Sequence, residues 1–72
     1  MSDIETLQVT TPIRLGQFLK LANLVGSGAE GAELIAAGEV TVDGETCTAR
    51  GRQLTGGEVV EVGDLAMKVA SR

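Results

Sequence analysis

Residues 11–44, TPIRLGQFLKLANLVGSGAEGAELIAAGEVTVDG, decide the fold of this 72-residue chain. Thr11 and Pro12 supply a hydroxyl N-cap and a proline at the first helical position, so a helix is expected to begin there. Apolar residues then recur at helical spacing as far as Gly26, a residue suited to a left-handed helix C-terminus. The face that this amphipathic helix would bury consists of Leu15, Phe18, Leu19, Leu21, Ala22 and Val25.

A second helix is expected directly after the first. Ser27 and Glu30 have the spacing of a capping box, in which a hydroxyl and a carboxylate satisfy N–H groups at the helix start. The helix would run to about Ala37 and end at Gly38. Its small residues would allow it to lie close against the first helix.

After the second helix, the period of the apolar pattern changes to the two residues that are typical of strands. Residues 40–42 alternate and lead into Asp43-Gly44, a strong signal for a two-residue hairpin turn. The order of elements is therefore β-α-α-β-β-β-β, which predicts an α+β fold in a single domain, residues 1–72. The other expected segments are a frayed start over 1–5, a loop over 50–53, and strands over 6–9, 46–49, 58–62 and 65–69.

Composition excludes several kinds of site. The chain has no His, no Trp and no Tyr, so the usual general base at neutral pH and most base-stacking rings are missing. The lone Cys47 can form neither an internal disulfide nor a zinc cluster. We therefore expect no enzymatic activity, no metal and no cofactor. Apolar runs of only a few residues predict no membrane span, and a cytoplasmic location is expected.

Residues 26–31, GSGAEG, match the letters of a dinucleotide-binding loop. That site requires a preceding strand and a surrounding βαβ unit, whereas a helix is expected here, so no dinucleotide is expected. Two compatible interpretations remain. The segment is a corner between helices, and the free N–H groups at the start of the second helix, beside Ser27, form a modest anion site.

The charges are unevenly distributed along the chain. Ten acids and six bases give a net charge of −4, the wrong sign for an indiscriminate polyanion binder. All acids lie within residues 3–5, 30–45 or 58–64. The acid-free windows between them hold four of the six cations: Arg14, Lys20, Arg50 and Arg52. If the fold brings the windows together, they form a local basic patch.

The ordered string of residues, more than any single one, resembles a known family. Residues 13–20, IRLGQFLK, are similar to the opening of the RNA-binding domain first named in small-subunit ribosomal protein four, the alpha-L motif. The resemblance extends over residues 13–62 and is nearest to a short, free-standing, ribosome-associated bacterial branch. It includes Ser27-Gly28, Ala32, Leu34-Ile35, Gly38, Val40, Val42-Asp43-Gly44, Arg50, Arg52 and the segment 57–62.

This resemblance implies two packed helices on a small, mostly antiparallel sheet. It also implies binding of structured RNA, ribosomal or transfer RNA, with the ribosome as a further expected partner. The residues it would place on the RNA-facing surface are Arg14, Lys20, Ser27, Gly28, Arg50 and Arg52.

Some positions depart from the family pattern. Glu33 stands in the second helix where relatives commonly have Lys or Arg, and Asp43 occupies the hairpin where Asn is common. Gly28 replaces an Arg found in many larger relatives, and the basic run after the hairpin is thinned. These changes leave open an alternative, a protein-interaction module on the same fold that has lost most of its RNA affinity.

Overall fold

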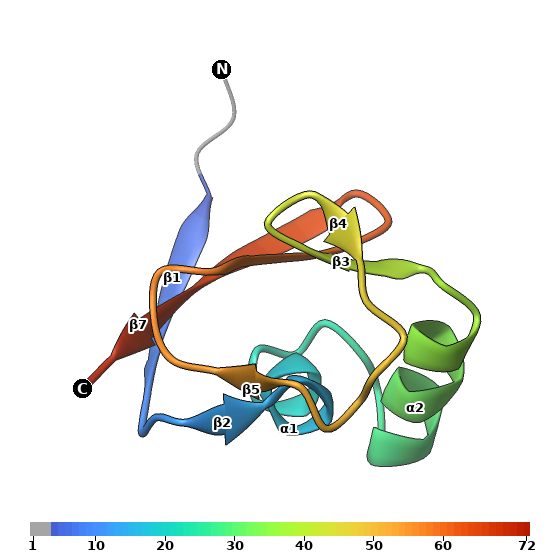
Figure 1. Cartoon of the computed structure of the whole chain (residues 1–72), viewed down its shortest axis with the longest axis horizontal. Coiled ribbons are helices and arrows are strands. Elements are labelled where there is room, and N and C mark those ends of the chain that lie inside the picture. Colours follow the sequence, from blue (N-terminus) through green and yellow to red (C-terminus); the bar gives the residue numbers. More distant parts are fainter. Residues whose placement is uncertain (1–3) are drawn as a thin grey trace.

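Two helices lie against one side of a five-stranded sheet in the computed structural model, which describes residues 4–72 (Figure 1). Of the start expected to be frayed, residues 1–5, residues 1–3 lie outside the described part, and the expectation is wrong for Glu5, which pairs with Met67 in the main sheet. The helices are α1 (Leu15–Leu21) and α2 (Gly28–Ala36). The strands are β1 (Glu5–Val9), β2 (Ile13–Arg14), β3 (Val40–Val42), β4 (Glu45–Thr46), β5 (Gln53–Leu54), β6 (Val59–Val62) and β7 (Leu65–Ser71).

The main sheet has the strand order β1-β7-β6-β3-β4. Only the β1–β7 pair is parallel, with Leu7 opposite Val69, and the other pairs in this sheet are antiparallel. A separate two-stranded ladder joins β2 to β5. The structure therefore confirms the α+β class and the mostly antiparallel sheet.

The core lies between the helices and the inner face of the main sheet. Alternate strand residues point inward, and Val40, Val42 and Val60 are at most 1% exposed. From the helices, Leu15, Phe18, Leu19 and Ile35 are equally buried. Burial of such a side chain contributes roughly 1.5–3 kcal/mol, so this one layer of contacts holds the helices to the sheet.

The first helix is shorter than the sequence predicts at both ends. It begins at Leu15, not at Thr11-Pro12, because Ile13 and Arg14 are extended and pair antiparallel with β5. It ends at Leu21, and Asn23, not Gly26, takes the left-handed conformation (φ 59°). The β5 residues that pair with Ile13 and Arg14 lie about forty positions further along the chain, so signals within the local sequence could not reveal this pairing.

The second helix confirms the sequence prediction closely. The Ser27 Oγ accepts a hydrogen bond from the Glu30 N–H at 3.2 Å. The Glu30 carboxylate accepts from the N–H of Gly26 at 2.7 Å, one residue before the position that a capping box predicts. A Cβ added to the buried Gly31 would lie 3.4 Å from a methyl group of Val25. The absence of a side chain there lets α2 lie close to the segment that follows α1.

The hairpin forms at Asp43-Gly44, where both residues have positive φ angles, 53° and 83°. The Asp43 carboxylate also accepts a hydrogen bond from the N–H of Val59 at 3.0 Å, which ties the turn to β6. The return strand is limited to β4, shorter than the predicted 46–49. The predicted loop over 50–53 is correct for 50–52 but misses β5, which begins at Gln53.

Candidate nucleic-acid interface

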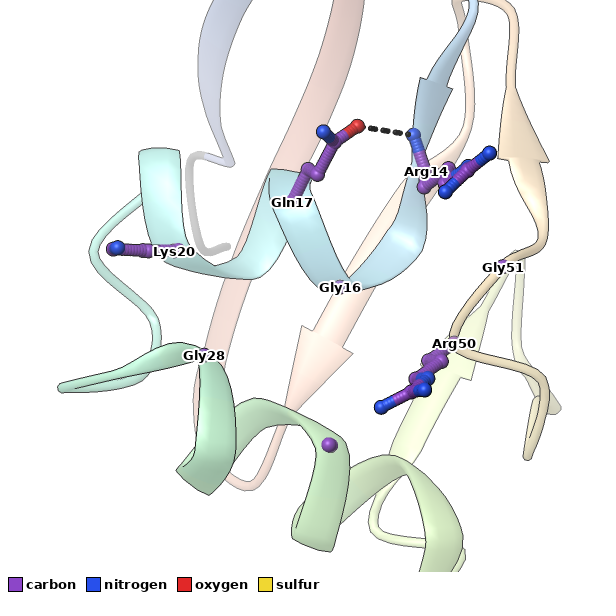
Figure 2. Close-up of a pocket in the computed structure, with 8 residues that line it drawn as sticks. Arg14, Gly16, Gln17, Lys20, Gly28, Arg50 and Gly51 are labelled. Atoms are coloured by element: carbon purple, nitrogen blue, oxygen red, sulfur yellow. Dashed lines mark hydrogen bonds between the residues drawn. The ribbon is translucent and has the colours of Figure 1, made fainter.

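A hollow of about 330 Å³ lies where α1, the start of α2 and the loop after β4 meet (Figure 2). The fold thus brings both acid-free windows of the sequence to one place. Its lining includes no acidic residue. The residues that line it are Arg14, Gly16, Gln17, Lys20, Gly28, Ala32, Arg50 and Gly51.

The start of α1 holds the loop in position. The first N–H groups of a helix have no partner within the helix and must find one elsewhere. Here the N–H of Leu15 donates to the Arg52 carbonyl oxygen at 2.8 Å, and that of Gly16 donates to the Arg50 carbonyl oxygen at 3.1 Å. The same two bonds that satisfy the helix therefore place Arg50 beside the hollow.

The backbone N–H of Arg14, directly before α1, finds its hydrogen-bond partner in a side chain. The Gln17 Oε1 accepts from the N–H of Arg14 at 3.3 Å, as the dashed line in Figure 2 shows. Arg14 has only donors in its side chain and cannot complete a reciprocal cap. Its guanidinium is therefore not used to cap the helix.

Three exposed cations surround the hollow. Arg14 and Lys20 come from the first acid-free window and Arg50 from the second. Figure 2 shows Arg50 extending from its loop toward α2. On a molecule of net charge −4, this is a local concentration of positive charge, and concave surfaces of one sign attract oppositely charged ligands.

Four of the six predicted site residues line this hollow, and two do not. Ser27 directly precedes Gly28 and caps α2, so one lone pair of its Oγ is already used. Arg52 follows Gly51 directly and its side chain is exposed. Its backbone carbonyl oxygen accepts from the N–H of Leu15 at the start of α1. The Glu30 carboxylate lies at the α2 start as well, which makes this corner less favourable for an anion than the sequence predicts.

Sequence reasoning missed four residues of the lining: Gly16, Gln17, Ala32 and Gly51. A Cβ added at Gly28 or Gly51 would meet no atom within 4 Å, so the backbone there is open to a ligand. Neutral residues give no charge signal in a sequence, and only their position beside the cations could have indicated them.

Glu33 lies close to the basic hollow. It lines a neighbouring hollow together with Arg50 and Ala32, both of which also line the basic one. The departure from the family pattern thus places an acid near one of the three cations. It reduces the positive potential without removing a cation from the site.

The described residues offer few groups for metal binding, thiol chemistry or membrane insertion. Across residues 4–72 no cluster of His, Cys, Asp and Glu could hold a metal ion. The Cys47 thiol is buried and directed at the Ala49 carbonyl oxygen, 3.7 Å away. Within the same residues, no helix has the length and apolarity needed to cross a membrane.

A family model described as "S4 domain" matches residues 6–70. The chain belongs to the S4 domain family, as its sequence predicts. The Bacillus subtilis (strain 168) protein described as "Probable ribosome maturation protein RlbA" is 45% identical over 53 residues, which cover 74% of this chain and 75% of that one.

Two solved structures are similar to this fold. The solution structure of YbcJ from E. coli, described as having an alpha-L motif involved in RNA-binding, matches with a TM-score of 0.72 and 29% identity. The match covers 97% of this chain and 91% of YbcJ. The 30S ribosomal protein S4e from Thermoplasma acidophilum matches with a TM-score of 0.54 and 27% identity, over 72% of this chain and 26% of that protein. The likeness to YbcJ confirms the predicted alpha-L fold.

Proposed function

We propose that this protein is a non-enzymatic module that binds structured RNA, ribosomal or transfer RNA, through the basic hollow. The observation that carries the proposal is that Arg14, Lys20 and Arg50 all line one concave surface whose lining contains no acidic residue. The described functions of two relatives agree with it, since one is a probable ribosome maturation protein and the other has an RNA-binding motif.

The hollow is suited to contacts with phosphate groups. The three cations can neutralise phosphates and release their counterions, which is the sequence-independent part of nucleic-acid affinity. The open backbone at Gly28 and Gly51 allows a ribose or phosphate to approach closely. Arg52 and the Ser27 hydroxyl flank the hollow and would add contacts at its margin.

Recognition would depend on the shape of the RNA more than on its bases. Proteins that read single-stranded RNA usually stack its bases on aromatic rings. The only aromatic residue of this chain is Phe18, which is 0% exposed. The surface therefore fits the phosphates and 2′-hydroxyls of a folded RNA.

The same composition supports a binding role without catalysis. The chain has no His, and its single thiol is buried. A partner that is ribosomal or transfer RNA also implies a cytoplasmic location, which we include in the proposal.

Co-sedimentation of the full-length protein with ribosomal particles at low and high salt tests this function, together with gel retardation of ribosomal and transfer RNA. We expect binding at about 50 mM salt that is lost on raising the salt, because the affinity is modest and comes mainly from charge contacts with phosphates. The variant Arg50→Ala/Arg52→Ala removes two cations and leaves the backbone carbonyls that accept from α1. Absence of RNA binding at low salt, or equal binding by this variant, would refute the proposal.

A further inference from the structure

A second groove, of about 480 Å³, shares no residue with the basic hollow. It lies where the segment 22–24, directly after α1, meets the N-terminal ends of β1 and β7. Its lining is Ile4, Glu5, Ala22, Asn23, Leu24, Asp64, Leu65, Ala66 and Met67. The RNA surface and this groove therefore use different parts of the molecule.

The groove exposes apolar side chains to solvent. Among the described residues, three large apolar side chains are exposed, and two of them, Ile4 (45%) and Leu65 (53%), line this groove. Leu24 and Met67 lie beside them, half-buried against the core. Adjacent exposed apolar groups that border the core mark a surface where a partner can bury area.

The charges of the groove select the kind of partner. Glu5 and Asp64 are its ionisable residues, and no Lys or Arg lines it. Two exposed carboxylates oppose an RNA phosphate or an anionic lipid and favour a cationic ligand. The apolar side chains between them require that ligand to carry an apolar group as well.

We propose that this groove binds a basic polypeptide segment that carries a bulky apolar side chain. The segment would place its apolar side chain against Leu65 and Leu24 and its Lys or Arg residues near Glu5 and Asp64. This partner goes beyond the proposed RNA function and does not depend on it. Because the two surfaces share no residue, the protein can hold RNA and a basic protein together.

The test uses the ¹⁵N-labelled full-length protein and a short synthetic peptide of lysine and serine with two central leucines. On titration, we expect chemical-shift changes in the amides of Asn23, Leu24 and residues 64–67. The amides of residues 14–20, at the basic hollow, should not move. A matched peptide with serines in place of the leucines should bind at least about fivefold more weakly, because it buries no apolar group.

Paired variants separate this groove from general attraction to an acidic protein. Glu5→Gln/Asp64→Asn should weaken peptide binding about three- to fivefold, the effect of two exposed charge pairs. The control Glu45→Gln/Glu61→Gln makes the same charge change at exposed positions outside the groove and should have less than about a twofold effect. Equal losses in both pairs would overturn the proposal.

The apolar contact has its own control. Leu65→Ser should weaken peptide binding about fivefold, whereas Leu21→Ser, at another exposed leucine that lies outside the groove, should not. Both variants keep the core intact, which thermal unfolding verifies. Equal binding by the serine peptide would overturn the proposal. So would self-association of the protein that Leu65→Ser abolishes, because a second copy would then be the occupant.

Discussion

Removing two of the three cations around the basic hollow should change the salt dependence of RNA binding in a defined way. The variant is Arg14→Gln/Arg50→Gln, and both side chains are exposed, so the fold should be unaffected. Each phosphate contact contributes about −0.7 to −0.9 to the slope of log K against log salt. The three lining cations by themselves therefore predict a slope between about −2 and −3 for the native protein and about −1 for the variant; a contact from Arg52 would make both slopes steeper by the same amount and leave their difference unchanged.

The same numbers give the loss of affinity. Two lost contacts correspond to about a 100-fold loss at roughly 50 mM salt and about 10- to 20-fold at roughly 200 mM, with the two curves converging toward 1 M. Fluorescence anisotropy with a labelled structured RNA, measured over this salt range, gives both the slope and the offset. Thermal unfolding of the variant shows whether the protein remains folded.

The control Lys68→Gln/Arg72→Gln changes the net charge equally, from −4 to −6, at residues that do not line the hollow. It should lower RNA affinity less than about threefold, because exposed charges that make no direct contact with phosphate act only through screened, longer-range attraction. If both pairs lose the same affinity, the net charge of the protein and not the hollow governs binding. An unchanged slope in Arg14→Gln/Arg50→Gln would likewise refute the reasoning.

Three further predictions concern packing, titration and the α2 start. Gly31→Leu should lower the free energy of unfolding in urea by about 1–3 kcal/mol, because a Cβ there is already in contact with its neighbours; unchanged stability would contradict the close packing of α2. Burial raises the pKa of Glu58, but hydrogen bonds from Thr55 and Gly56 outweigh it and lower the pKa below the ordinary 4.5. The stability that this carboxylate contributes is thus present above pH 4.5 and lost as the pH falls through the lowered pKa. The free energy of unfolding of Glu58→Gln in urea should therefore differ most from that of the native protein at neutral pH and least at acidic pH. Glu30→Gln keeps an oxygen that can accept from the Gly26 N–H but removes a negative charge from the α2 start, and should tighten RNA binding about two- to threefold in gel retardation; no tightening would place the phosphates away from this corner.

The candidate site was only partly predictable from the sequence. The charge pattern singled out Arg14, Lys20, Arg50 and Arg52, because cations stand out in acid-free windows. The first three line one hollow, whereas Arg52 lies outside its lining. The charge pattern could not show that Gly51 lines the hollow, since a glycine has no charge or apolar period to reveal it. The capping-box spacing, in contrast, did indicate that the Glu30 carboxylate turns back to the α2 start, where it accepts from the Gly26 N–H and opposes an anion at the same corner.

By itself, the sequence determined the elements whose signals are local. The Ser27 cap, the helix to which it belongs and the Asp43-Gly44 turn depend on hydrogen bonds and φ preferences within a few residues, and they appear where predicted. Tertiary structure decided the start of α1, which the pairing of β2 with β5 moves to Leu15. It also decided the basic hollow, because the carbonyl oxygens of the 50–52 loop complete the α1 start through contacts between residues distant in sequence. Such contacts form only when the chain is folded, and no local propensity encodes them.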